Sequence, residues 1–217
     1  MVHACGCDGG FEIFDEKSAE EDLERYRRHG PDDTTAMLVE MILDRGVDGS
    51  DLLDIGGGIG VIDHELLGAG AGRAVLVDAS PAAVEAARVE ARRRGTLDRL
   101  EFVDGDFVSR ASDVDVADIV TLDRVICCYP DVESLVRLSA TRARSLYGLV
   151  LPRDRRLLRW SLPLLNAWFR LRGFRYRTFL HRNARIDDIV AKAGLRPIRE
   201  HHTFVWRVVL YERLARA

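Results

Sequence analysis

The stretch from Asp51 to Gly60 narrows the folds open to this chain more than any other. It reads Asp-Leu-Leu-Asp-Ile-Gly-Gly-Gly-Ile-Gly, a short apolar strand that runs into a glycine-dense turn, and a helical pattern follows over 61–67. Glycines at 56, 58 and 60 allow a tight turn whose N–H groups approach a ligand closely. This order of strand, turn and helix predicts a ligand-binding unit of an α/β fold.

The spacing of these glycines differs from the dinucleotide-binding signature G-x-G-x-x-G. Counted from Gly56, the third glycine of that signature falls at position 61, which is Val61. The acid Asp54 stands at the end of the strand, where its carboxylate would repel a pyrophosphate and suits a ligand with a positive amino group. A nicotinamide-dependent oxidoreductase is therefore disfavoured.

Strand-like and helix-like segments alternate after the glycine turn. Strands are expected at 73–78, 100–103, 118–122 and 148–151, and helical patterns lie between them, the last over about 132–146. This alternation predicts a mostly parallel sheet with helices on both faces. After an amphipathic stretch (157–172) broken by Pro163 and a helix near 186–193, strands at 197–204 and 207–212 are close enough to form an antiparallel hairpin.

An acid stands at or just after the end of each of four successive strands. These acids are Asp54, Asp78, Asp106 and Asp123, and Phe107 follows the third. Ligands of open α/β sheets bind beyond the carboxyl ends of the strands. A single strand-end Asp is as often a cap of the following helix, but four in register with a glycine loop indicate a ligand site.

The chain from about Phe14 onward resembles the class I S-adenosylmethionine-dependent methyltransferases, with their motifs at 54–60, 78, 104–107 and 118–124. Within that superfamily it is most similar to the magnesium-protoporphyrin O-methyltransferase-like group. The matching stretches are Arg25-Tyr26-Arg27-Arg28-x-Gly30, Leu53 to Gly60, and Asp123-Arg124-Val125 running to Cys128-Tyr129. The resemblance implies a Rossmann-like, seven-stranded, mostly parallel sheet with a C-terminal antiparallel hairpin.

The resemblance also implies the cofactor S-adenosyl-L-methionine, its product S-adenosyl-L-homocysteine, and roles for individual residues. Asp54 and the glycines face the methionine portion, Asp78 the ribose, Asp106 and Phe107 the adenine, and Asp123 the methyl group. The expected cofactor-binding residues are Asp54, Gly56, Gly57, Gly58, Gly60, Asp78, Ala79, Asp106, Phe107 and Asp123. The candidate catalytic residues are Asp123, Tyr129 and Tyr26.

O-methylation of a small or amphipathic molecule is the expected chemistry. A carboxylate acceptor is already ionised near neutral pH and needs no general base, whereas a hydroxyl profits from one. N-methylation of bases is disfavoured, because Asp123-Arg124-Val125-Ile126 stands where such enzymes carry Asn/Asp-Pro-Pro-aromatic. His29, His181, His201 and His202 are expected in surface or structural roles. The alternative is a non-catalytic binding protein or partner subunit, which would lack a shaped acceptor pocket beneath 157–180.

The segment 153–185 holds ten arginines, no lysine and the single acid Asp154. Leucine and tryptophan side chains lie between the arginines. Three interpretations stay open: a cap over a flat, carboxylate-bearing acceptor, a contact with an anionic membrane surface, and a homodimer surface. No recognised nucleic-acid-binding module accompanies the charge, so no nucleic acid is expected as partner.

The length of 217 residues fits one domain. We expect a helical lid (1–46), a cofactor-binding core (47–152), a substrate-cap insertion (153–185) and a last helix with the hairpin (186–217). Neither a secretion signal nor a membrane-length apolar run is visible, so the cytoplasm is expected. The four cysteines, as Cys5-x-Cys7 and Cys127-Cys128, give no disulfide framework. No metal site is expected either, because His3 with the first pair lacks a fourth ligand.

Overall fold

The sheet of this protein has seven strands in the order β3-β2-β1-β4-β5-β7-β6. The computed structural model describes residues 15–173 and 177–214. Strands β1 to β5 are mutually parallel, and β7 pairs antiparallel with both β5 and β6. The strands are β1 (Asp51–Ile55), β2 (Arg73–Asp78), β3 (Leu100–Asp104), β4 (Ala117–Asp123), β5 (Ala143–Pro152), β6 (Leu195–His202) and β7 (Trp206–Arg213). The predicted Rossmann-like fold with its terminal hairpin is confirmed.

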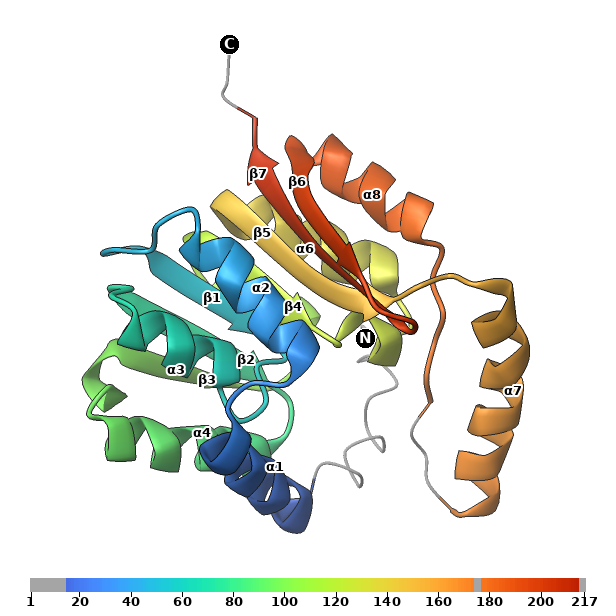
Figure 1. Ribbon diagram of the computed structural model, residues 1–217, viewed down its shortest axis with the longest axis horizontal. Helices are drawn as coiled ribbons and strands as arrows, with labels where there is room; N and C mark the ends of the chain where they lie inside the picture. The colour runs from blue at the N-terminus through green and yellow to red at the C-terminus, as the bar shows by residue number, and fades with distance from the viewer. Residues whose placement is uncertain (1–14, 174–176, 215–217) are drawn as a thin grey trace.

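Helices cover both faces of the sheet (Figure 1). The helices are α1 (Glu16–His29), α2 (Asp33–Leu43), α3 (Val61–Gly68), α4 (Pro81–Arg94), α5 (Phe107–Arg110), α6 (Val132–Arg142), α7 (Arg156–Leu171) and α8 (Asn183–Lys192). Helices α2, α3 and α4 pack on one face, and α5, α6 and α8 pack on the other. Helix α1 packs beside α4, and α7 stands away from the sheet (Figure 1).

Two hydrophobic clusters, one on each face, hold the layers together. The central strands β1 and β4 are buried along nearly their whole length, as expected of parallel strands covered on both sides. One cluster contains Leu38 and Ile62 from the helices of the first face, and the other contains Val136 and Ile186 from those of the second. The sheet is thus packed on both faces, and a site can form at the carboxyl ends of its strands.

Several helix ends follow their sequence signals. Ser80 caps α4, accepting a hydrogen bond from the Ala83 N–H at 3.2 Å, and Pro81 occupies the first turn. Gly95 ends the same helix in the left-handed conformation, with φ +69°, which a glycine adopts without steric cost.

Three boundaries differ from the expectation. Helix α6 ends at Arg142, and β5 begins at Ala143, five residues earlier than predicted. The pairing of β5 with β4 and β7 extends back over these residues and buries Tyr147 completely. Pro163 lies inside α7 and does not break it, and α8 begins at Asn183.

In the described part of the chain, no helix is both long enough and apolar enough to cross a membrane.

Candidate active site

A cavity of about 1770 Å³ opens at the carboxyl edge of the sheet. Its walls come from the ends of β1, β2 and β4 and from the helices α1 and α7. The predicted site residues among its lining are Tyr26, Asp54, Gly56, Gly57, Gly58, Asp78, Ala79, Asp106, Phe107, Asp123 and Tyr129. Gly60 lies outside this lining and forms the N-terminal cap of α3. The structure therefore brings nearly all predicted positions to one cavity.

The glycine turn after β1 has a backbone that other residues would not adopt. Gly56 and Gly58 have φ of +67° and +58°, in the left-handed region where side chains are disfavoured. A Cβ on Gly57 would lie 2.7 Å from Asp54 Oδ2 and 2.9 Å from Leu76 Cγ. At Gly57 the absence of a side chain thus lets the turn pack on the buried Asp54 and Leu76. At Gly58, which lines the cavity and where a Cβ would meet no atom within 4 Å, it leaves the backbone bare toward the cavity.

Asp54 lies beneath this turn and is only 1% exposed. Its Oδ1 accepts a hydrogen bond from the Thr121 hydroxyl at 2.6 Å. The carboxyl group of Asp63, from the first turn of α3, is fully buried and interacts with the carboxyl group of Asp54. Burial raises the pKa of both carboxyl groups, and Asp54 raises that of Asp63 further, whereas the hydrogen bonds from Thr121 and Asp63 oppose the shift of Asp54. We infer that the pair shares a proton near neutral pH.

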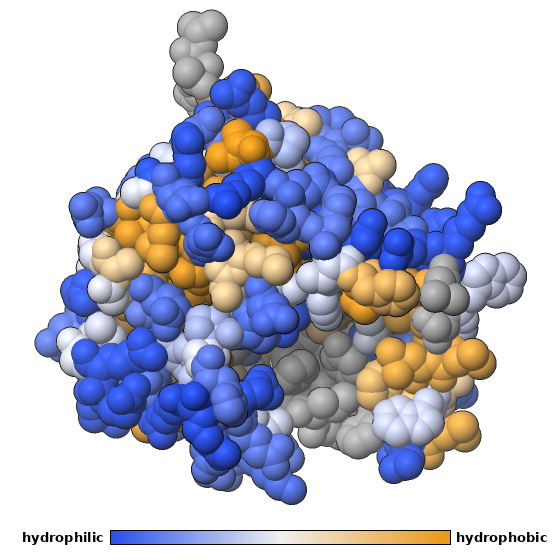
Figure 2. Space-filling view, viewed as in Figure 1, coloured by the Kyte–Doolittle hydropathy of each residue, from blue (hydrophilic) through white to orange (hydrophobic). Residues whose placement is uncertain are grey.

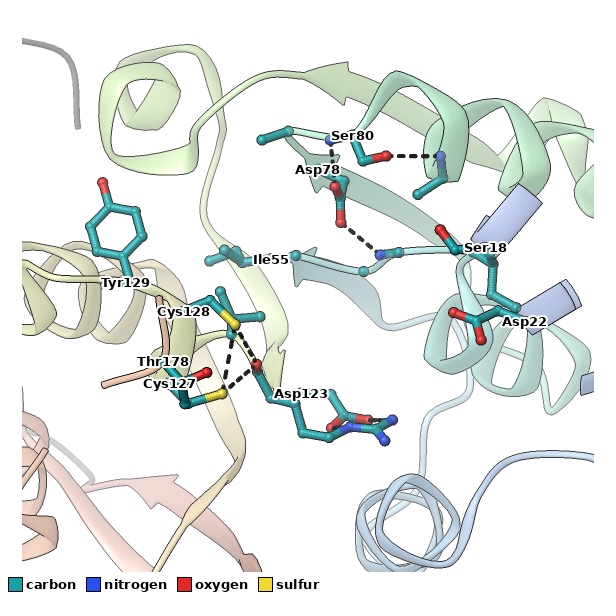
Figure 3. Close-up of a pocket in the computed structure, with 18 of the residues that line it drawn as sticks. Ser18, Asp22, Ile55, Asp78, Ser80, Asp123, Cys127, Cys128, Tyr129 and Thr178 are labelled. Carbon is teal, nitrogen blue, oxygen red and sulfur yellow. Dashed lines mark hydrogen bonds and ion pairs between the residues drawn. The ribbon is translucent and has the colours of Figure 1, made fainter. Parts of the chain in front are cut away.

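Asp78 ties the glycine turn to the next strand (Figure 3). Its two carboxylate oxygens accept the N–H groups of Gly58, at 2.8 Å, and Ser80, at 2.7 Å. Burial raises the pKa of Asp78, although these hydrogen bonds oppose the shift. Each carboxylate oxygen has a further lone pair, so the group can also accept hydrogen bonds from a ligand.

Asp106 caps the N-terminus of helix α5. Its Oδ2 accepts the N–H of Ser109 at 3.0 Å and the Ser109 hydroxyl at 2.8 Å, at the start of α5. Phe107 beside it is buried and lines the cavity. Capping and contact with a ligand are compatible, so the adenine assignment of these two residues stays a prediction.

Asp123 ends β4 within a network that the sequence did not reveal. Its carboxylate accepts hydrogen bonds from the Thr35 hydroxyl and from Arg124 Nε, the latter at 3.0 Å. Arg124 also pairs with Asp32, the cap of α2, at 2.6 Å, and it is a non-glycine residue with φ +59°. Burial raises the pKa of Asp123, and Arg124 opposes the shift. A left-handed arginine beside a buried carboxylate marks a site worth functional tests.

The three candidate catalytic residues do not converge on one point. The Tyr26 hydroxyl donates to Glu65 Oε1 at 2.5 Å, and burial together with this bond raises the Tyr26 pKa well above its usual value. Tyr129 is 7% exposed, and its hydroxyl points away from Asp123 (Figure 3). Their catalytic roles therefore stay predictions.

The histidines considered from the sequence take peripheral places. His29, His201 and His202 are exposed, and the ring of His181 contacts the Tyr129 carbonyl oxygen at 2.9 Å. Sequence reasoning missed His64, which is fully buried and stacks on Tyr26. Within 15–173 and 177–214, no group of three or more Cys, His, Asp and Glu side chains is arranged to hold a metal. His3, Cys5 and Cys7 lie outside the described residues.

Helix α7 and the segment 177–182 form a cap that is fastened to the cavity rim. Asn166 Nδ2 donates to the Thr178 carbonyl oxygen at 2.9 Å, and the Thr178 N–H donates to Asn166 Oδ1 at 3.0 Å. The Phe179 N–H donates to the Cys127 carbonyl oxygen at 2.7 Å. Asn166 and Arg170 line the cavity from the inner side of α7.

The outer side of α7 is apolar and exposed. Trp160 and Leu164 are 81% and 74% exposed and lie outside the cavity lining. Figure 2 shows orange, hydrophobic surface on the right, over α7. Exposed apolar residues gathered in this way indicate an interaction surface.

Comparisons with known proteins agree with this geometry. Residues 52–146 match the family model described as "Methyltransferase domain". Magnesium protoporphyrin IX methyltransferase from Synechocystis PCC 6803, solved with bound S-adenosylhomocysteine, superposes with a TM-score of 0.67 at 20% identity, covering 92% of this chain and 100% of that one. An O-methyltransferase family protein from Burkholderia thailandensis gives a TM-score of 0.70 at 17% identity, covering 92% and 60%.

A curated relative matches over a longer part of the chain. Ribosomal protein L11 methyltransferase from Yersinia pseudotuberculosis is 28% identical over 153 residues, which cover 67% of this chain and 52% of that protein. The chain thus spans about half the length of the curated relatives it matches.

Residues 52–146 are thus similar to a methyltransferase domain, the fold is that of solved methyltransferases, and the expected resemblance to the class I S-adenosylmethionine-dependent methyltransferases is confirmed. S-adenosylmethionine is the cofactor that this domain implies. Among the solved structures, the magnesium protoporphyrin methyltransferase shares the fold over nearly the whole of both chains. The bare glycine turn and the carboxylate of Asp78 in one cavity fit such a cofactor.

Proposed function

We propose that this protein transfers the methyl group of S-adenosylmethionine to an oxygen atom of a small or amphipathic acceptor. The observation that carries the proposal is the continuity of one cavity from Gly58 and Asp78 to Asn166 and Arg170. Its volume of about 1770 Å³ exceeds the roughly 300–1,000 Å³ of common ligand pockets. It therefore has room for both a cofactor and an acceptor.

The proposed roles keep the order of the strands. Asp54 and the glycine turn hold the methionine portion, Asp78 with Ala79 the ribose, and Asp106 with Phe107 the adenine. Asp123, Tyr129 and Tyr26 border the acceptor side. We also propose one domain in four parts, as expected above: a lid (1–46), a core (47–152), a cap (153–185) and a final helix with hairpin (186–217).

S-adenosylmethionine, when bound, supplies an electrophilic methyl group. The chain contributes alignment for an in-line displacement and shields the reacting atoms from water. A carboxylate acceptor needs no proton transfer, whereas for a hydroxyl acceptor Asp123 is the best-placed base. Burial raises the pKa of Asp123, which makes its carboxylate a stronger base than an ordinary aspartate.

The acceptor that fits the cap is flat and carries a carboxylate. Arg170 and Arg177 line the cavity. In the described part of the chain, neither has an acidic side chain within ion-pair distance. Arginine binds carboxylates with two parallel hydrogen bonds, so these side chains are available to an anionic acceptor.

We propose further that the outer side of α7 contacts an anionic membrane surface. Trp160 and Leu164 supply the apolar face, and the arginines of 153–172 supply the positive charge. Two copies of such a helix would repel each other, which disfavours the homodimer. The homodimer is the competing outcome of the test described in the Discussion.

The proposal is tested by methyl transfer from tritiated S-adenosylmethionine to a panel of flat carboxylic acids and phenols. We expect transfer to a carboxylate-bearing member. Substitution Arg170→Ala should raise its KM roughly 10- to 100-fold, because hydrogen bonds to charged groups contribute about 1.5–3 kcal/mol. Arg159→Ala, on the same helix but outside the cavity lining, is the control.

Cofactor binding without transfer to any member of the panel would contradict the proposed activity. It would favour the alternative from the sequence, a protein that binds S-adenosylmethionine or S-adenosylhomocysteine without turnover.

A further inference from the structure

Two adjacent thiols stand in the cavity wall, and the proposed methyl transfer gives them no role. Cys127 and Cys128 end the short 3₁₀ helix η4 (Ile126–Cys128), directly after β4, and both line the cavity. Their Sγ atoms lie 3.7 Å apart. Both sulfurs point to the carbonyl oxygen of Arg124, at 3.1 Å and 3.6 Å (Figure 3). The pair is thus convergent.

A direct disulfide suits this pair poorly. The Cα atoms of consecutive residues lie about 3.8 Å apart across a trans peptide, whereas disulfides usually join Cα atoms about 4.4–6.8 Å apart. A bond between the two sulfurs would therefore be strained and easily reduced. Neither cysteine takes part in a disulfide in the structure.

One atom bonded to both sulfurs suits the geometry much better. Bonds of about 2.3 Å, as in zinc–thiolate pairs, hold two sulfurs roughly 3.3–3.8 Å apart for bond angles of about 90–109°. The observed separation of 3.7 Å falls within that range. The two sulfurs can accept a bridging atom with little movement of the loop, whose position the Phe179 N–H fixes through the Cys127 carbonyl oxygen.

The number of protein ligands available decides which element could bridge the two sulfurs. Structural zinc takes four protein ligands, and the described residues offer no group of three or more Cys, His, Asp and Glu side chains for a metal. Trivalent arsenic completes its valence with two thiolates and one further substituent. Such an arsenical needs nothing from the chain beyond the two cysteines.

We propose that Cys127 and Cys128 form a dithiol site for trivalent arsenicals in the wall of the cavity. An arsenical of the form R–As(OH)₂ condenses with the two thiols to give R–As(SCys)₂ and two molecules of water. Two As–O and two S–H bonds break, while two As–S and two O–H bonds form. Arsenic stays trivalent, so no oxidant or reductant takes part.

The state of the thiols is consistent with this exchange of neutral groups. The hydrogen bond with Cys128 and burial raise the pKa of the Cys127 thiol. A protonated thiol is a poor target for oxidants, because the thiolate is the reactive form. The condensation consumes two thiols and releases water, so its overall balance needs no free thiolate.

The substituent R would project into the cavity on the side of the cap. Thr178 lies beside Cys127 in Figure 3, whereas Asp78 and Ser80 lie across the cavity from the thiols. An adduct should therefore occupy space near Thr178 and leave the region around Asp78 open.

The experiment uses phenylarsine oxide and the full-length variant in which Cys5→Ser and Cys7→Ser are combined. The chain has four cysteines, so this background retains only Cys127 and Cys128, and any adduct found in it involves them. Intact-mass measurement should show one phenylarsenic group per chain. The adduct should survive excess 2-mercaptoethanol and be removed by 2,3-dimercaptopropanol, as expected for a chelate.

Adding Cys127→Ser or Cys128→Ser to this background should abolish the thiol-resistant adduct. Titration with S-adenosylhomocysteine checks that each variant remains folded, and peptide mapping of the unsubstituted adduct locates the arsenic even where a variant fails to fold. An adduct that persists with either cysteine replaced would overturn the proposal. So would the absence of a thiol-resistant adduct in the background variant.

Discussion

Asp54 and Asp63 show how a residue outside a sequence motif can govern one inside it. Both carboxyl groups are buried beneath the glycine turn, and they interact with each other. Two adjacent buried carboxylates cannot both ionise without a large cost. If they share one proton, Asp63 donates a hydrogen bond to Asp54 and holds it under the turn.

This shared proton predicts a pH dependence of stability. The unfolded chain loses both protons above a pH of about 4, whereas the native pair retains one. The native state then binds more protons, so the free energy of unfolding falls as pH rises from about 4 through the raised native pKa. In Asp63→Asn the side-chain amide donates the hydrogen bond without binding a proton, so the decrease in the free energy of unfolding with rising pH should disappear.

Urea denaturation between about pH 5 and about pH 8 measures the effect. The stability of Asp63→Asn relative to wild type should grow with pH, by up to about 1.4 kcal/mol per pH unit for one proton. Asp98→Asn, at an exposed position, is the control and should follow wild type. Parallel curves for wild type and Asp63→Asn would rule out the shared proton.

Asp78 carries the ribose assignment. Substitution Asp78→Ala removes the acceptor of the Gly58 and Ser80 N–H groups and the proposed partner of the ribose hydroxyls. We expect S-adenosylhomocysteine to bind roughly 10- to 100-fold more weakly, as for the loss of charge-assisted hydrogen bonds, while the protein stays folded.

Calorimetric titration and a thermal melt of each variant measure the two quantities. Asp104→Ala is a matched control, because Asp104 pairs with Asp78 in the sheet register but lies outside the cavity lining. Wild-type affinity in Asp78→Ala would show that the ribose assignment is wrong.

For single residues, the sequence indicated which ones lie at the cavity better than it indicated which side chains they contact. The glycines and the four strand-end acids could be found because their spacing reports the ends of strands. Thr35, Asp63 and His64 could not, because what marks them is burial and contact with residues distant in the chain. Thr35, for example, reaches Asp123 across 88 positions.

Among the elements, α7 is joined to the segment 177–182 through the side chain of Asn166. Asn166 forms both hydrogen bonds to Thr178, and its position on the cavity side of α7 orients the cap over the acceptor region. Substitution Asn166→Ala should loosen the cap without touching the cofactor end of the cavity.

We expect the substitution to change the KM of the acceptor but not the affinity for S-adenosylhomocysteine. The KM of the acceptor should rise roughly 5- to 30-fold, corresponding to one or two kcal/mol, and S-adenosylhomocysteine affinity should stay as in wild type. Asn183→Ala is the control amide, since Asn183 holds the Pro152 carbonyl oxygen outside the cavity lining. Equal losses of acceptor and cofactor binding would contradict the role of a cap.

Element boundaries were predictable where local chemistry sets them. Ser80, Pro81 and Gly95 bound α4 as expected. The start of β5 was not predictable, because residues 143–147 suit a helix locally and are brought into the sheet by pairing with β4 and β7. The helix through Pro163 was likewise missed, since a proline removes a helical hydrogen bond.

For the whole molecule, the proposal to test is the contact of α7 with an anionic membrane surface. Co-sedimentation with phosphatidylcholine vesicles, with and without phosphatidylserine, tests the proposed membrane contact. Binding should require the anionic lipid, weaken with salt, and be lost when Trp160→Ser and Leu164→Ser are combined.

Sedimentation velocity on the same variants covers the competing outcome. A wild-type dimer that these two substitutions dissociate, together with absence of vesicle binding, would replace the membrane contact by a homodimer.

Calorimetric titration with S-adenosylhomocysteine beside NAD tests the central claim most directly. In the proposed function, the bare glycine turn, Asp54 and Asp78 hold an adenosyl amino acid and not a pyrophosphate. The account predicts micromolar binding of S-adenosylhomocysteine and none of NAD. Binding of NAD, or of neither compound, would contradict it.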